Sequence, residues 1–181
     1  YHGDMEGWHR AEVEARAQEA ARRQKELEQV SVAVLSALIR ALEAKSSYFK
    51  GHSEAVARLA ETIATRLRLA EGEVQEVRIA GLLHDIGMIA VPDRIIEKGG
   101  ELTPQERDRL REHCRTGAEI LRPFPHLKTP AEYVLHHHER LDGTGYPDQL
   151  KGEAISLGAQ VVGMAEAYVA LTEERSFRAS L

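Results

Sequence analysis

The sequence has little or nothing of several features that mark whole classes of protein. Its one cysteine, Cys114, cannot form an internal disulfide, which favours a reducing cytoplasm. No apolar run is long enough to cross a bilayer, so we expect neither a membrane segment nor a signal peptide. The net charge of −5 disfavours a nucleic-acid polymer as partner. No segment alternates apolar and polar residues as a strand does, and we therefore expect an all-α protein.

The first 45 residues also lack helix breakers, because no glycine or proline follows Gly7 in this stretch. Two positions of a seven-residue repeat form a candidate seam, which runs Val13, Arg16, Ala20, Arg23, Leu27, Val30, Val34, Ala37 and Ala41. Apolar residues fill both positions only from Leu27 onward. We expect residues 1–45 to form a long signalling and dimerisation helix with a coiled-coil seam. The alternative is a single amphipathic helix packed against its own domain.

The remaining residues, 46–181, predict a bundle of shorter helices punctuated by glycine, proline and capping residues. The first two expected helices run from residue 52 to Glu71–Gly72 and over 73–86, and a loop over 91–100 follows them. The next helix starts at a capping box at Thr103 and is stopped by Pro123, and a short helix starts at a second capping box at Thr129 and reaches His138. The last expected helix covers 157–173. We also expect the chain to be part of a longer protein, with a sensor domain before Tyr1 and further helices after Arg178.

Residues 82–88 read Leu-Leu-His-Asp-Ile-Gly-Met and place His84 and Asp85 at the end of an apolar helix. A carboxylate beside an imidazole is costly there unless it is paired or bound to a metal. Taken alone, the dipeptide is more often a capping histidine followed by a solvated aspartate. Other segments of the chain decide between these interpretations.

Four further helical segments bring metal-ligating side chains to an apolar face. They carry His52, His113, the pair His137 and His138, and Glu166. A core that held so many unpaired imidazoles and carboxylates would be unstable, whereas first-row divalent metals suit this mixture of ligands. The set therefore predicts a metal centre. Cys114, next to His113, is interpreted as a helix filler.

Three consecutive histidines at 136–138 precede a turn that reads Gly143-Thr144-Gly145-Tyr146-Pro147. With His84-Asp85, this stretch strongly resembles the HD-GYP family, a branch of the HD metal-dependent phosphohydrolases, from about Ala44 to the end of the chain. The resemblance implies an HD-domain helical bundle preceded by a long helix. It also implies hydrolysis of the bacterial messenger cyclic di-GMP to linear pGpG and/or GMP, in the cytoplasm, at a centre of iron or manganese.

The resemblance implies a role for each motif residue. One metal would be bound by His52, His84, Asp85 and Glu166, and the second by His113, His137 and His138. Asp85 would bridge the two ions, and a bridging hydroxide at this centre, with His84 and Asp85 as its catalytic core, would attack phosphorus in line.

Residues near the substrate phosphates are implied in the same way. They are Gly145 and Tyr146 of the turn over 143–147, which we call the signature loop, together with Arg175, Arg178 and the residue at position 88, here Met88. Without the family, the two arginines would fit a solvated helix end. The signature loop would also be the docking surface for a diguanylate cyclase (GGDEF) domain.

The sequence departs from the family pattern at four positions. Met88 replaces a lysine that would contact phosphate, and its absence could raise the barrier by about one to a few kcal/mol. Glu166 replaces a ligand aspartate, and Val169 replaces a second aspartate. Tyr48 stands where members with three metals carry a glutamate, so we expect two metals.

The leading hypothesis is a cyclic di-GMP phosphodiesterase that forms a homodimer through its N-terminal helix. One alternative is a catalytically weak or inactive module that binds cyclic di-GMP or a diguanylate cyclase and transmits a signal. Another is a phosphohydrolase that acts on a different nucleotide.

Overall fold

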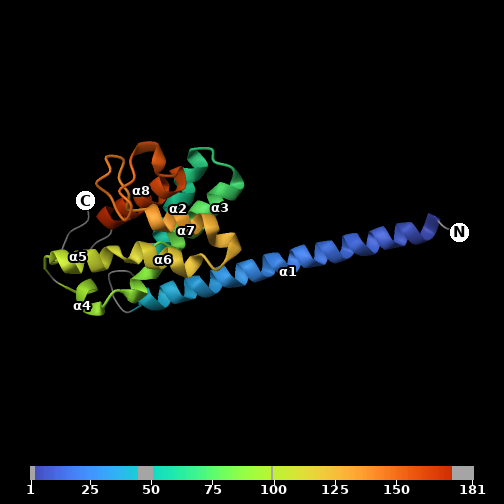
Figure 1. Cartoon of the computed structure of the whole chain (residues 1–181), viewed down its shortest axis with the longest axis horizontal. Helices are drawn as coiled ribbons and strands as arrows, with labels where there is room; N and C mark the ends of the chain where they lie inside the picture. Colours follow the sequence, from blue (N-terminus) through green and yellow to red (C-terminus); the bar gives the residue numbers. More distant parts are fainter. Residues whose placement is uncertain (1–2, 45–50, 99, 173–181) are drawn as a thin grey trace. The chain divides into compact units, whose positions relative to one another are not determined.

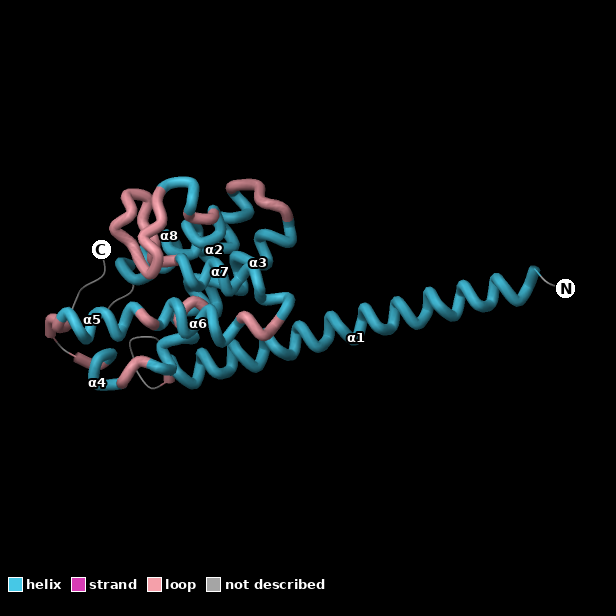
Figure 2. Tube along the Cα trace, in the orientation of Figure 1, coloured by secondary structure: helices cyan, strands magenta, loops and turns pink. Residues whose placement is uncertain are grey.

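The computed structural model of the chain describes residues 3–44, 51–98 and 100–172 (Figure 1). Every regular element in these ranges is helical and none is a strand, which confirms the all-α prediction (Figure 2). In chain order the elements are α1 (Gly3–Glu43), α2 (His52–Arg66), α3 (Glu71–Leu83), η1 (Ile86–Ala90), α4 (Asp93–Ile96), α5 (Pro104–Arg111), α6 (His113–Leu121), η2 (Pro125–Leu127), α7 (Lys128–His136), η3 (Gly152–Ala154) and α8 (Leu157–Thr172).

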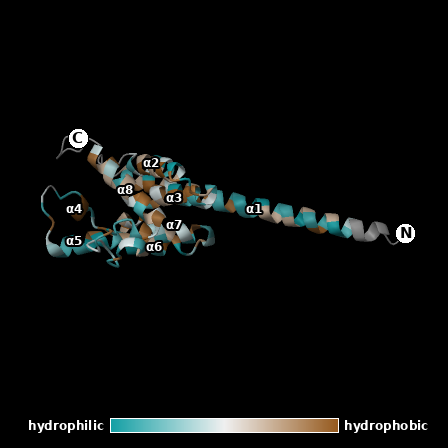
Figure 3. Cartoon of the chain, turned by 90° about the horizontal axis from the view of Figure 1, so that it is seen from above, coloured by the Kyte–Doolittle hydropathy of each residue, from teal (hydrophilic) through white to brown (hydrophobic). Residues whose placement is uncertain are grey.

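Two compact units divide the chain, Tyr1–Val34 and Leu35–Leu181. The first is the greater part of α1, a largely hydrophilic helix with ion pairs between residues four apart, such as Arg23 with Glu19 (Figure 3). The long helix is therefore confirmed, while its coiled-coil seam stays a prediction. No helix among the described residues has the length and apolar character needed to cross a membrane.

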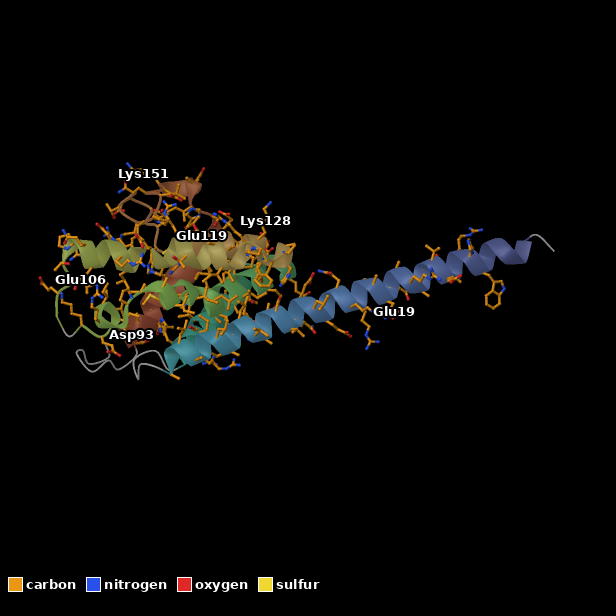
Figure 4. All side chains as sticks on the ribbon, turned by 60° about the horizontal axis from the view of Figure 1, so that its bottom comes forward. Glu19, Asp93, Glu106, Glu119, Lys128 and Lys151 are labelled. Atoms are coloured by element: carbon orange, nitrogen blue, oxygen red, sulfur yellow. The ribbon has the colours of Figure 1, made fainter. Side chains whose placement is uncertain are left out.

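The second unit is a helical bundle built around α3, which contacts α2, α7 and α8. Its fully buried side chains include Val56, Ala60, Val77, Leu83, Val134 and Val162. Charged residues such as Glu119, Lys128 and Lys151 lie on the outside (Figure 4). The polar motif residues described below are therefore exceptions in an otherwise apolar interior.

The predicted end of the first bundle helix was wrong, because α2 stops at Arg66 rather than at Glu71. Arg68 adopts a left-handed conformation with φ of 61°, and its N–H donates to the carbonyl of Thr65 at 3.0 Å. This is a helix termination that usually uses glycine, which explains why the sequence did not reveal it. Glu71 begins α3, whose first turn is held by the Glu73 carboxylate accepting the N–H of Ala70.

Other parts of the expected helix pattern also differ in the structure. The predicted loop over 91–100 contains the single turn α4, and the helix that starts after Thr103 breaks at Glu112 into α5 and α6, which continue in nearly one direction (Figure 1). The Thr103 capping box is confirmed, since its hydroxyl accepts the N–H of Glu106 at 3.2 Å. The second capping box is wrong: α7 begins at Lys128, and Pro130 fits inside its first turn, where no intrahelical N–H bond is lost.

Candidate metal centre

His84 is the residue after α3, and its ring is fully buried. Its Nδ1 lies 2.8 Å from the carbonyl oxygen of Gly81, three residues earlier. His113 and His137 repeat this arrangement, with Nδ1 at 2.8 Å from Leu110 O and 2.7 Å from Val134 O. A carbonyl can only accept, so each Nδ1 carries a proton, and in the neutral ring Nε2 then offers a lone pair. Metal-binding histidines are oriented in this way.

Nε2 of His137 is buried without a hydrogen-bond partner in the described structure, and the buried Nε2 of His84 lies 3.2 Å from Oδ2 of Asp85. An unsatisfied buried polar atom is costly unless it binds a ligand. A divalent metal is the ligand that suits a neutral imidazole with a fixed tautomer. The donor set therefore fits a metal centre.

The candidate ligands form two groups, and within each group the ligand atoms lie within 4.8 Å of one another. The first group contains His52, His84 and Asp85, and the second contains His113, Cys114, His137 and His138. Asp85 joins them, since its Oδ2 lies 3.2 Å from Nε2 of His84 and its Oδ1 lies 3.6 Å from Nε2 of His113. One carboxylate thus has an oxygen available to each group.

His52 reaches the first group because a residue that the sequence analysis missed fixes the start of α2. The Glu43 carboxylate accepts the N–H of Gly51 at 3.0 Å and the N–H of Ser53 at 2.9 Å. These two bonds satisfy backbone donors that a helix start leaves open. Glu43 is itself buried near the end of α1, and it holds the first turn of α2 in place.

Glu166 extends from α8 toward the second group. Its Oε2 lies 3.8 Å from Nε2 of His137 and 3.6 Å from Nδ1 of His138. The resemblance implies that Glu166 binds the first metal. In the structure, both of these distances are to imidazoles of the second group.

Two glycines bring the ligand segments together, and the sequence analysis missed both. A Cβ on Gly87 would overlap the carbonyl oxygen of His113, and a Cβ on Gly163 would overlap that of His137. Any side chain at either position would push η1 away from α6, or α8 away from α7. The only signal in the sequence was a glycine within a helical pattern.

The signature loop is fixed by two carboxylates. Glu139 accepts the N–H of Asp148 at 2.6 Å and the N–H of Leu150 at 3.0 Å. The Asp148 carboxylate in turn bonds Nε2 of His136 at 3.0 Å and the Arg115 guanidinium at 2.5 Å. His136, the first of the three consecutive histidines, therefore anchors the loop and is absent from both ligand groups.

Tyr146 of this loop stacks on His138, with ring centroids 4.8 Å apart and planes at 29°. The Arg111 guanidinium lies 5.1 Å from the Tyr146 ring centroid. These side chains line a cavity of about 480 Å³ that also reaches Gly145, His137, Glu166 and Arg140. The cavity therefore places the ring of Tyr146 and the guanidinium groups of Arg111 and Arg140 beside the second group of candidate ligands.

Met88 lines a smaller cavity, of about 60 Å³, whose wall also includes Asp85. Acidic residues Glu43, Asp93 and Glu97 share this wall, and no lysine or arginine of the described chain does. Arg175 and Arg178, predicted to contact phosphate, and Tyr48 lie outside the described residues. Their roles therefore stay predictions.

The sequence model of the HD domain family matches residues 36–181. The chain belongs to the HD-domain family. This membership confirms the resemblance carried by the His-Asp pair and the signature loop. Among solved structures, the HD-domain chain resembles the crystal structure of a cyclic GMP-AMP specific phosphodiesterase of Vibrio cholerae, V-cGAP3, with a TM-score of 0.61 at 21% identity over 81% of this chain and 42% of that chain. At this identity the likeness supports the fold.

Two curated relatives are similar to most of the HD-domain chain. The cyclic di-GMP phosphodiesterase response regulator RpfG of Xanthomonas campestris pv. campestris is 38% identical over 155 residues, which cover 84% of this chain and 41% of RpfG. The 3′3′-cGAMP-specific phosphodiesterase 3 of Vibrio cholerae is 37% identical over 148 residues, which cover 82% of this chain and 32% of that protein. The chain spans less than half the length of either relative.

The pKa values of the candidate ligands in this HD domain are shifted in different directions. Burial opposes a charge on His84, but the Asp85 carboxylate outweighs it and raises the pKa of His84 to about 9. Burial also opposes the charge of Asp85, yet His84 and His113 hold the pKa of that carboxyl well below its usual 3.8. Burial lowers the pKa of His138 to about 3 and that of His137 well below 6.5. Both are therefore neutral near pH 7, the form that binds metals.

Proposed function

We propose that this HD domain hydrolyses cyclic di-GMP to linear pGpG and/or GMP at a centre of two divalent metal ions. The observation that carries the proposal is the pairing of two buried histidine groups through one carboxylate, Asp85. Lone buried imidazoles would destabilise the core, so their clustering requires a ligand. The names of the two relatives support a cyclic dinucleotide as substrate.

The first metal site would take His52, His84 and Asp85, and the second would take His113, His137 and His138. Asp85 would bridge the two sites with its two oxygens. Glu166 adds a second carboxylate, and its distances to His137 and His138 favour the second site. The Nδ1–H bonds to backbone carbonyls hold the rings in place and make each Nε2 more basic.

Mixed nitrogen and oxygen donors suit iron or manganese, which we propose as the ions. When bound, two such ions supply a nucleophile from water near neutral pH and offset the charge of the phosphate. The protein positions the substrate: Tyr146 lines the cavity beside His138, and Arg111 and Arg140 offer guanidinium groups to phosphate. Arg175 and Arg178 would add to this positive charge.

A turnover assay tests the proposal. Metal-free protein is loaded anaerobically with iron(II) or manganese(II), the metals per chain are counted, and products from cyclic di-GMP and 3′3′-cGAMP are followed by chromatography. We expect linear dinucleotide or GMP, formed faster from cyclic di-GMP. His84→Ala should abolish the product, while His9→Ala, at an exposed position of α1, should not change it. Two bound metals without any product would contradict the enzyme proposal.

A catalytically weak or inactive module is the second candidate. Met88 favours it, because the smaller cavity beside Asp85 has no described cation to contact a phosphate. Such a module would bind cyclic di-GMP or a diguanylate cyclase domain and transmit a signal. Binding of cyclic di-GMP by the metal-loaded protein, with no turnover, would select this candidate.

We also propose that two copies of the chain associate through α1 in the bacterial cytoplasm. Seam residues Leu27, Val30 and Val34 are 66%, 58% and 54% exposed in the single chain, although each is a large apolar residue. A partner helix would cover them in a two-stranded coiled coil. Sedimentation of the wild type and of Leu27→Glu would test this. A monomeric wild type would contradict the proposal.

A further inference from the structure

Cys114 lies in the first turn of α6, directly after His113, and its side chain is fully buried. Its Sγ lies 3.5 Å from Nε2 of His113, on the nitrogen that the backbone bond to Leu110 leaves open. The thiol therefore points into the second ligand group. The resemblance assigns this cysteine no role there.

The distance fits two ligands of the same ion. With metal–nitrogen and metal–sulfur bonds of about 2.0 and 2.3 Å, the two ligand atoms of a tetrahedral site lie about 3.5 Å apart. Sγ of Cys114 also lies within 4.8 Å of the ligand atoms of His137 and His138. Four donors of one group thus lie close enough together to hold one ion.

A second observation points to a ligand at the same position. Nε2 of His137 is buried and makes no hydrogen bond within the described structure. An unsatisfied buried nitrogen is costly, so it indicates a ligand at the position beside which Sγ of Cys114 lies. An ion bound by Cys114 and the three histidines would satisfy it.

We propose that Cys114 is a ligand of the second metal site, which would then combine three imidazoles with one thiolate. This inference rests on the proposed metal centre and not on phosphodiester hydrolysis. Binding forms a metal–sulfur bond and breaks the S–H bond, whose proton leaves to solvent. Thiolate is a soft ligand, so the second site prefers iron(II), cobalt(II) or zinc(II) over manganese(II).

Cobalt(II) gives a direct readout, because thiolate ligation produces a charge-transfer band in the near ultraviolet that imidazole and carboxylate ligands do not. The chain has no other cysteine, so any such band must come from Cys114. We expect the band in wild type loaded with two cobalt ions per chain. In Cys114→Ser the band should be absent, and the second cobalt should bind at least tenfold more weakly.

Two controls separate ligation from folding. Circular dichroism and thermal unfolding of both proteins without metal check that serine keeps the fold. X-ray absorption of the zinc-loaded wild type needs no variant, and it should place a sulfur neighbour about 2.3 Å from zinc. Two cobalt ions without the band, or zinc without a sulfur neighbour, would overturn the inference and leave the metal centre intact. If no metal binds, the proposed centre and the inference both fail.

Discussion

Asp85 and His113 come from different parts of the chain, yet Oδ1 of Asp85 lies 3.6 Å from Nε2 of His113. The other oxygen of Asp85 faces His84, its neighbour in sequence. Gly87 makes this approach possible, because any side chain there would meet the backbone of α6. One carboxylate thus links two histidine groups that the sequence only suggests are close.

Replacement of Asp85 tests this link. Asp85→Asn keeps the shape of the side chain but loses the charge that two cations would share. We expect metal content to fall from two ions to one or none per chain, and turnover to fall by about 10³-fold or more, equivalent to about 4 kcal/mol. Asp108→Asn, at an exposed position of α5, is the matched control. Full metal occupancy in Asp85→Asn would show that this carboxylate is not a bridge.

The metal-free protein should lose stability as the pH rises. Burial opposes the charge of His84, but Asp85 raises its folded pKa to about 9, above the ordinary 6.5. The His84 contribution is therefore complete below pH 6.5 and disappears as the pH passes about 9. Since the folded pKa of Asp85 is well below 3.8, its contribution is present above that value and is lost only in stronger acid.

Urea unfolding of the metal-free protein at pH values below 6.5 and above 9 measures this effect. The expected fall in the free energy of unfolding is about 1–3 kcal/mol. His84→Gln should remove most of the difference between the two pH values. A wild-type profile as flat as that of the variant would mean that the pair is not charged in the metal-free protein.

The candidate ligands could be proposed from the sequence because each lies within or directly beside an apolar helix, where a polar group needs a reason. The residues that bring the ligands together could not. Gly163 acts through its contact with the backbone of His137, and Glu43 acts from the end of α1 on the start of α2; neither contact leaves a periodic signal. The end of α2 was missed for a similar reason, since Arg68 carries a conformation that the sequence pattern assigns to glycine.

Replacement of Gly163 should weaken metal binding, as replacement of a candidate ligand would. A methyl group at this position would overlap the carbonyl oxygen of His137, so α8 and Glu166 must move away from α7. We expect Gly163→Ala to lower the free energy of unfolding by about 1–3 kcal/mol and to weaken binding at the second metal site.

Gly72 provides the matched control, because it lies in the first turn of α3 and no atom lies within 4 Å of the place that a Cβ would take. Gly72→Ala should leave metal binding unchanged and raise helix stability by roughly 0.5–1 kcal/mol. Chemical unfolding and metal titration of both variants test the prediction. If the two substitutions behave alike, close packing at Gly163 does not position the site.

Met88 offers a gain of function. The family resemblance implies a lysine at this position, and the cavity that Met88 lines opens on Asp85. A lysine there could contact a phosphate oxygen and stabilise charge that develops in the transition state. We expect Met88→Lys to raise kcat/KM for cyclic di-GMP by about ten- to several-hundred-fold, or about one to a few kcal/mol.

Ile89→Lys is the control for this prediction. Ile89 lines the same cavity but is 57% exposed. A lysine at this position adds the same charge near the cavity, with its side chain largely in solvent. Both variants should be compared at equal metal content, so that kcat/KM reports substrate contacts alone. A gain confined to Met88→Lys would mean that methionine limits the natural activity. Equal gains would indicate general attraction of the anionic substrate, and no gain would mean that phosphate binds away from Met88, on the side of Tyr146 and Arg111.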